Sequence, residues 1–135
     1  MKILGIEHIG IAVDDLNKTS SFWGSILNIL HTHTEVVESE QVKTSIFDTK
    51  KGKIELLSSS SSSSVIEKFI KNKGTGIHHV CLEVDNISIA INELKEKNID
   101  LINNKPKIGA EGYKIVFIHP KSTGGVLVEL AEKPK

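Results

Sequence analysis

The chain has 135 residues, of which 39% are hydrophobic and 25% are charged, and its 17 basic and 17 acidic residues leave a formal net charge of zero. This length fits one compact domain, or two small halves that share a core, and the composition is typical of soluble globular proteins. The zero net charge argues against a nucleic-acid partner or a membrane surface. Every basic residue is Lys, so the chain lacks the guanidinium group that commonly binds carboxylates and phosphates in a bidentate manner.

Cys81 is the single cysteine, which excludes a disulfide framework and a thiolate metal cluster. The first residues lead directly into a strand pattern, and no segment resembles a signal peptide, a transit peptide or a membrane span. We therefore expect a cytoplasmic protein that folds as one domain over residues 1–135.

The first predicted strand covers residues 3–13, where apolar residues alternate with small or polar ones. Its apolar face, with Ile9, Ile11 and Val13, is expected to pack against a helix. The opposite face carries His8 beside small residues, which leaves open space in front of the imidazole.

A helix follows this strand and is capped by Asp14 or Asp15. Its apolar residues recur at helical spacing and are expected to form a core stripe, namely Leu16, Thr19, Phe22, Trp23, Ile26 and Leu27. Three further strands are predicted, with a Lys-Lys-Gly turn before the last of them, at about 31–37, 41–48 and 53–57.

Residues 58–64 are all Ser, a composition that buries no apolar surface and is typical of a flexible linker. The last of them, Ser64, fits a capping box with Glu67 and is expected to open a short helix through about Lys71. Residues 58–76 are therefore expected to join two halves of the chain.

The second half repeats the plan of the first. A strand at 77–84 places His79 and Cys81 on one face, and Asp85 is expected to cap the helix that follows. The core face of this helix is predicted to consist of Ile87, Ala90, Ile91 and Leu94. Three strands are predicted after it, with a Gly-rich hairpin turn before the last, at about 99–103, 113–118 and 125–131.

The two halves also share short sequences. The stretch that begins at His8 recurs at His79, and the Ile-Glu-Leu of residues 54–56 recurs as the Val-Glu-Leu of residues 128–130. The chain therefore contains an internal repeat, residues 3–57 and 77–131. We predict an α+β fold in which two tandem βαβββ modules form a curled, half-open mixed sheet that encloses a cavity and is backed by helices.

Strand parity directs two histidines and two carboxylates away from the helix-backed face. A single His on a strand is usually packed or solvated, and a single Glu on an edge strand is usually a solvated charge. Because both types occur in both halves, the repeat instead predicts a metal site made of His8, Glu55, His79 and Glu129. His78 has the opposite parity and is not expected to be a ligand. Mixed imidazole and carboxylate ligation suits Co²⁺, Mn²⁺, Ni²⁺ or Zn²⁺.

A family resemblance runs from about Ile6 to Leu130. It is carried by residues 7–13, 53–57, 76–80 and 105–109 and, above all, by the His-Pro-Lys-Ser-Thr-Gly-Gly-Val-Leu-Val-Glu-Leu of residues 119–130. These stretches resemble the methylmalonyl-CoA epimerases, which belong to the vicinal oxygen chelate superfamily together with the glyoxalases and the bleomycin-resistance proteins.

The resemblance implies epimerisation at C2 of methylmalonyl-CoA, a homodimer, and a divalent cation (Co²⁺ is favoured) that stabilises the enolate formed by proton abstraction. His8, Glu55, His79 and Glu129 match the family's ligand positions, and Glu129 also matches its proton donor and acceptor. Some bacterial members have a second acid where this chain has Thr44, so Glu55 is expected to serve as the second base. Without Arg, binding of the CoA phosphates is expected to depend on backbone N–H groups and on Lys105, Lys107 and Lys121.

Three other functions share this architecture. A glyoxalase I-type lyase would use the same four ligands, but the carboxylates of its glutathione substrate are commonly held by guanidinium groups, which this chain lacks. A drug-binding resistance protein needs a large aromatic-lined groove, whereas the chain has one Trp, one Tyr and four Phe. A metal-dependent dioxygenase usually has two His and one carboxylate, whereas the repeat offers two carboxylates.

Overall fold

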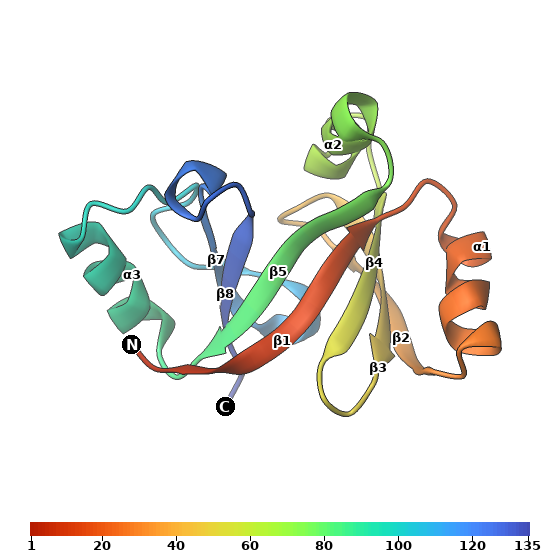
Figure 1. Ribbon diagram of the computed structural model, residues 1–135, viewed down its shortest axis with the longest axis horizontal. Coiled ribbons are helices and arrows are strands. Elements are labelled where there is room, and N and C mark those ends of the chain that lie inside the picture. The colour runs from red at the N-terminus through yellow and green to blue at the C-terminus, as the bar shows by residue number, and fades with distance from the viewer. The chain divides into compact units, whose positions relative to one another are not determined.

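The computed structural model describes residues 1–135 and divides into two compact units (Figure 1). One is the continuous unit, residues 8–78, and the other is the split unit, residues 1–7 and 79–135. The elements follow the βαβββ order twice, as β1-α1-β2-β3-β4 and as β5-α3-β6-β7-β8, which confirms the predicted α+β fold of two tandem modules. None of the helices has the length and apolar composition needed to span a bilayer.

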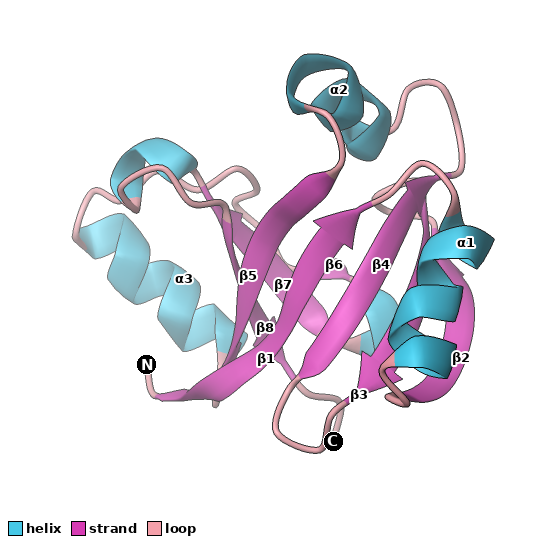
Figure 2. Ribbon diagram, turned by 45° about the vertical axis from the view of Figure 1, so that its right-hand side comes forward, coloured by secondary structure: helices cyan, strands magenta, loops and turns pink.

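The first module contains a mixed sheet in the strand order β2-β3-β4-β1. β4 runs parallel to β1, whereas β3 pairs antiparallel with both β2 and β4. The strands are β1 (Ile3–Ala12), β2 (Leu30–Val37), β3 (Val42–Asp48) and β4 (Lys53–Ser59). α1 (Leu16–Ser21) and the π-helical segment Phe22–Ile26 that continues it lie along one face of this sheet (Figure 2).

Alternation along the strands separates the two faces of this sheet. Val13, Phe47 and Leu56 form a buried cluster on the face that carries α1, and Leu16 and Trp23 of the helical segment pack against it. The predicted packing of the apolar strand face against a helix is therefore confirmed. Side chains of the opposite parity, including the titratable ones, lie on the other face.

The helix after β1 differs from the prediction in its second half. Asp15 caps α1 as predicted, by accepting a hydrogen bond from the Lys18 backbone N–H at 3.0 Å. From Phe22 onward the chain forms a π-helical turn, in which each residue advances by a smaller angle than in an α-helix. This change of period turns Phe22, Ile26 and Leu27 outward, where they are 46%, 68% and 47% exposed. The prediction that these three residues belong to the core is wrong.

The Ser tract is only partly a linker. Ser58 and Ser59 extend β4 and pair with β3. The hydroxyls of Ser61 and Ser63 donate hydrogen bonds to Gln41 Oε1, at 2.6 and 2.8 Å. These bonds tie the tract to the turn between β2 and β3, so the prediction of a flexible linker is wrong for these four residues.

Ser64 caps the helix α2 (Val65–Lys73), as predicted, and this helix continues beyond the expected end at Lys71. Its hydroxyl oxygen accepts a hydrogen bond from the Ile66 backbone N–H at 3.2 Å. Only 1% of Ser64 is exposed, because the start of α2 is packed against the sheet through the buried Ile66.

The second module has the strand order β5-β8-β7-β6, with β8 parallel to β5 and antiparallel pairing elsewhere. Its elements are β5 (Gly76–Val84), α3 (Ile87–Glu96), β6 (Lys107–Ile108), the 3₁₀ turn Ala110–Gly112, β7 (Lys114–Ile118), the 3₁₀ turn Pro120–Ser122 and β8 (Val128–Glu132). The predicted core face of α3 is confirmed. It forms one buried cluster with side chains of β5, β7 and β8, made of Val84, Ile87, Ala90, Ile91, Leu94, Val116, Ile118 and Leu130.

The strand predicted at 99–103 is absent, apart from one bridge between Leu101 and Ile118. The side chain of Asn103 accounts for this difference. Its amide oxygen accepts a hydrogen bond from the Phe117 N–H at 2.9 Å, and its amide nitrogen donates to the Ile115 carbonyl at 3.4 Å. The backbone of residues 100–102 makes only two hydrogen bonds with the end of β7, Ile102 N–H to the Phe117 carbonyl at 2.8 Å and His119 N–H to the Asp100 carbonyl at 2.9 Å. The Asn103 amide takes the next groups of β7, and the outer strand is instead β6.

The first residues of β1 belong to the split unit. The Lys2 N–H donates to Asp85 Oδ1 at 2.9 Å, and the Asp85 N–H donates to the Lys2 carbonyl at 3.2 Å. The hydrogen bond from Lys2 lowers the pKa of Asp85. Because this carboxylate is engaged by β1, α3 is capped by Asn86, which accepts from the Ile89 N–H at 2.9 Å. The predicted cap at Asp85 is therefore wrong.

The cap of α2 gives a direct test of the part that the Ser tract plays in folding. Ser64→Ala is expected to lower the free energy of unfolding by about 1 kcal/mol, because the Ile66 N–H loses its acceptor in a buried place. The matched control is Ser62→Ala, at an exposed position in the same tract, which should change the free energy by less than about 0.5 kcal/mol. Equilibrium urea unfolding measures both, and equal effects of the two substitutions would contradict the cap.

Candidate functional site

The continuous unit holds a buried pair made of His8 and Glu55. β1 and β4 run parallel, and their register places Glu55 opposite Gly10, two residues after His8. His8 Nε2 lies 3.2 Å from Glu55 Oε2. His8 is 5% exposed and Glu55 is 4% exposed, so both side chains are shielded from solvent.

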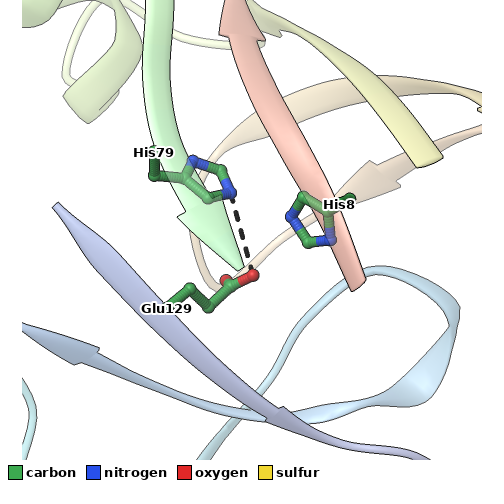
Figure 3. Close-up of side chains that lie close together, drawn as sticks. All are labelled: His8, His79 and Glu129. Atoms are coloured by element: carbon green, nitrogen blue, oxygen red, sulfur yellow. Dashed lines mark ion pairs between the residues drawn. The ribbon is translucent and has the colours of Figure 1, made fainter. Parts of the chain in front are cut away.

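The split unit holds an equivalent pair made of His79 and Glu129 (Figure 3). β5 and β8 also run parallel, and Glu129 lies opposite Cys81, two residues after His79. His79 Nε2 lies 3.7 Å from Glu129 Oε1, and both residues are buried. The His79 ring is further fixed by an edge-to-face contact with Phe117, with ring centroids 5.8 Å apart.

The neighbouring His78 has a different environment. Its ring makes an edge-to-face contact with Phe69 of α2, with centroids 4.9 Å apart. The parity argument that separates His79 from His78 therefore agrees with the contacts of both side chains. Cys81, on the same face as His79, is fully buried in an apolar cluster with Tyr113, which fits a space-filling role.

The donor atoms of each pair fit a divalent first-row cation. Two ligand atoms that are each about 2.1 Å from one ion lie about 3.0 Å apart in octahedral geometry and about 3.4 Å apart in tetrahedral geometry. The distances of 3.2 and 3.7 Å within the two pairs are close to these values. The longer one exceeds the usual range of a hydrogen bond and is an ion-pair distance. Neutral imidazole and carboxylate are also suitable ligand types.

Two further polar groups are buried near these strands. Glu7 is a buried carboxylate, and its Oε2 accepts a hydrogen bond from the Tyr113 hydroxyl at 3.4 Å. The sequence analysis did not predict this contact, because Glu7 has the parity opposite to His8 and nothing in the pattern connects it to the only Tyr of the chain.

Thr44 lies on β3 and has only 1% of its surface exposed. It is opposite Leu57 of β4, on the same face of the sheet as Glu55. Its hydroxyl is buried and has no hydrogen-bond partner in the protein. Some bacterial family members have an acid at this position, whereas this chain has a hydroxyl without a hydrogen-bond partner.

The three lysines that were assigned to CoA phosphates are all exposed residues of the split unit. Lys107 is in the short edge strand β6, and Lys105 precedes it in the same loop. Lys121 lies in the turn before β8 and pairs with Asp100 at 3.4 Å, with its side chain 63% exposed. Exposure leaves all three accessible to a large anionic molecule.

Comparison with known proteins identifies the family. Residues 7–117 match the Glyoxalase/Bleomycin resistance protein/Dioxygenase superfamily. The mitochondrial methylmalonyl-CoA epimerase of Mus musculus is 42% identical over 132 residues, which are 97% of this chain and 74% of the mouse protein. The ethylmalonyl-CoA/methylmalonyl-CoA epimerase of Cereibacter sphaeroides is 38% identical and covers 94% of this chain and 96% of its own length. This chain belongs to the methylmalonyl-CoA epimerase family.

Solved structures of methylmalonyl-CoA epimerases have the same fold. The enzyme of Mycobacterium tuberculosis superposes with a TM-score of 0.94 at 29% identity, over 98% of this chain and 90% of that one. A variant of the Streptomyces coelicolor epimerase, solved in complex with 2-nitronate-propionyl-CoA, gives a TM-score of 0.92 at 28% identity, over 99% and 100% of the two chains. These matches confirm the predicted fold and the predicted family of isomerases.

Proposed function

We propose that this protein interconverts the (R) and (S) epimers of methylmalonyl-CoA. Two observations support the proposal together: relatives about 40% identical over nearly the whole chain carry this activity in their names, and each module holds a buried imidazole–carboxylate pair at an equivalent position. The superfamily match includes glyoxalases, resistance proteins and dioxygenases, but the individual proteins named above are methylmalonyl-CoA epimerases, which favours the epimerase activity over these alternatives.

The resident cofactor is proposed to be one divalent cation, with Co²⁺ favoured over Mn²⁺, Ni²⁺ and Zn²⁺. Its proposed ligands are His8, Glu55, His79 and Glu129. Each module supplies one imidazole nitrogen and one carboxylate oxygen, and a six-coordinate ion with four protein ligands keeps two positions for substrate oxygens. When bound, such a cation supplies Lewis-acid stabilisation of the negative charge that develops on the thioester oxygen.

The residues of the chain are proposed to transfer the proton at C2. This proton lies between a thioester carbonyl and a carboxylate, and its removal gives a planar enolate. Glu129 is proposed to accept the proton on one side and to return it in the reverse direction, a role worth about 10²–10⁴-fold in rate for a well-placed group. The other side of the plane needs a second group, and Glu55 is the candidate within the quartet.

Because the chain has no Arg, we propose that lysine side chains and backbone N–H groups bind the phosphates of the acyl-CoA. Lysines bind phosphate as point charges, and the exposed Lys105, Lys107 and Lys121 are the proposed partners, together with backbone N–H groups of nearby Gly-containing turns.

A cytoplasmic location also stays a prediction of the sequence.

A homodimer is proposed on the basis of the N-terminal part of β1. Ile3, Leu4 and Ile6 are 47%, 52% and 60% exposed, which is unusual for three large apolar residues within four positions of one strand. Sedimentation equilibrium should give a mass of twice the 14.8 kDa of the chain, and Ile6→Lys should shift the protein toward the monomer. A monomeric wild-type protein would contradict the proposal.

The activity is tested by deuterium uptake at C2 of methylmalonyl-CoA in D₂O, measured by mass spectrometry. The protein is assayed after removal of metal with a chelator and after reloading with Co²⁺. Uptake is expected to be lost on removal and restored on reloading, because the enolate loses its stabilisation without the cation. Absence of uptake in the reloaded protein would discard this substrate, whereas uptake that persists in the metal-free protein would discard the metal.

The ligand set is tested by a pair of adjacent histidines. His79→Asn is expected to weaken Co²⁺ binding by more than about 100-fold. Loss of a residue that only supports a ligand typically costs about 10–100-fold in metal affinity, and His79 is proposed to be a ligand itself. His78→Asn is the matched control, because His78 packs against Phe69, and it should leave Co²⁺ affinity within about threefold. Calorimetric titration with Co²⁺ measures both variants, and equal losses would contradict the register on which the quartet rests.

A further inference from the structure

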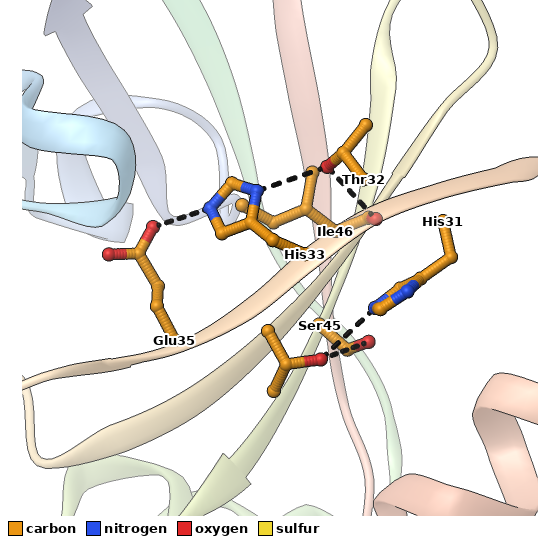
Figure 4. Close-up of polar contacts among 7 residues, drawn as sticks. His31, Thr32, His33, Glu35, Ser45 and Ile46 are labelled. Carbon is orange, nitrogen blue, oxygen red and sulfur yellow. Dashed lines mark hydrogen bonds and ion pairs between the residues drawn. The ribbon is translucent and has the colours of Figure 1, made fainter.

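A third imidazole–carboxylate pair lies on β2, outside the quartet (Figure 4). His33 Nε2 is 3.0 Å from Glu35 Oε1. The other ring nitrogen, Nδ1, is 3.3 Å from the Thr32 hydroxyl, which also donates to the Ile46 carbonyl at 3.3 Å. The imidazole is therefore oriented at both nitrogens. Its side chain is 41% exposed and that of Glu35 is 32% exposed, so both can meet a molecule from solvent.

The register of the sheet places this pair on the same face as Glu55. His33 is opposite Ile46, and Ile46 is opposite Glu55. Glu35 is opposite Thr44 in the neighbouring row. Since adjacent strands are about 4.8 Å apart, His33 and Glu55 stand roughly 10 Å apart along one row of side chains. This is the face that α1 does not cover, because α1 packs against side chains of the opposite parity such as Phe47 and Leu56.

The unsatisfied hydroxyl of Thr44 lies beside this pair. Thr44 is the direct cross-strand neighbour of Glu35, is 1% exposed, and has no hydrogen-bond partner in the protein for its Oγ1. Buried polar groups in native proteins are rarely left without a partner. This hydroxyl is itself buried, so His33 and Glu35, and not Thr44, are the groups that a molecule from solvent can reach.

The proposed reaction needs a second proton-transfer group, on the side of C2 opposite to Glu129. Glu55 and Glu129 are both proposed ligands of the cation, whereas His33 lies outside the quartet and its ring is available for proton transfer. We infer that His33 is the second acid–base residue and that Glu35 positions its ring. This inference rests on the proposed function and assigns Glu55 to the cation alone.

The proton and electron balance of the step is simple. The first base takes the proton from C2 as the C–H bond breaks, and the electron pair moves toward the thioester oxygen to give the enolate. Protonated His33 then gives its Nδ1 proton, which leaves the weaker 3.3 Å contact with Thr32 while Glu35 holds Nε2, to the opposite side of C2, where a new C–H bond forms and the electron pair returns to carbon. In the reverse direction neutral His33 takes the proton, so no oxidant, reductant or co-reactant is needed.

The inference is tested by supplying each epimer of methylmalonyl-CoA separately to the Co²⁺-loaded protein in D₂O and measuring deuterium exchange at C2 and inversion. His33→Gln is expected to slow epimerisation by about 10²–10⁴-fold, the usual contribution of an acid–base residue. The variant should still exchange the C2 hydrogen of one epimer without inversion, through the remaining base, and should no longer exchange that of the other. Co²⁺ affinity should be unchanged, because His33 is not a proposed ligand.

Glu35 and His31 supply the positioning variant and the control. Glu35→Gln is expected to lower kcat by about 10-fold or more with little change in KM, and Glu35→Asp should restore part of the loss, since a positioning carboxylate acts through the ring of His33. His31→Gln is the matched control on the same strand. The His31 ring faces the opposite side, against Phe47 with centroids 5.1 Å apart, and its replacement should leave both exchange rates within about threefold.

The outcomes separate this inference from the proposed function. Absence of exchange with both epimers in the wild-type protein would defeat the proposed function itself. An active wild-type protein together with a His33→Gln variant that exchanges both epimers at the wild-type rate would overturn the inference and return the second role to Glu55. An equal loss of exchange with both epimers in His33→Gln would also overturn it, because a structural role affects the two epimers alike.

Discussion

The parallel pairing of the first and last strands of each module is the constraint on which the site depends. It brings together residues that are far apart in the sequence, since β1 lies beside β4 and β5 lies beside β8. In both modules the Glu lies opposite the residue two positions after the His, so the imidazole and the carboxylate meet diagonally. A slip of one residue in either pairing would turn the carboxylate to the other face of the sheet, where it would displace part of an apolar cluster.

The apolar clusters of the two modules therefore determine to which face of the sheet the two carboxylates point. Leu56 is fully buried against Val13 and Phe47 under α1, and its burial determines that Glu55, one residue earlier, points to the opposite face. Leu130 has the same relation to Glu129, because it packs against the side chains of α3. Burying such side chains is worth about 1.5–3 kcal/mol each, which penalises any register that would expose them. The neighbouring imidazole offsets part of the cost of burying the carboxylate.

The repeat and the two-residue alternation were sufficient to predict the module order, the meeting of one His with one Glu inside each module, and the different environments of His78 and His79. The errors occurred where a distant group competes with a local pattern. Asp85 resembles a helix cap, but it bonds the backbone of Lys2, and Asn103 interrupts a strand pattern with its amide. The π-helical turn after Ser21 has no signal in the spacing of apolar residues.

The pair on β2 was missed for a related reason. Residues 31–35 are all polar or charged, so alternation does not say which of them face the open side of the sheet. An irregularity in the β2–β3 pairing between His31 and His33 changes the register there, and only the pairing with β3 assigns His33 to the face of Glu55.

The pairs differ in exposure, and this difference suits different tasks. The His8–Glu55 pair is buried and therefore shielded from water that would compete for a cation. The His33 imidazole is half-exposed and can exchange its proton with solvent after each turnover.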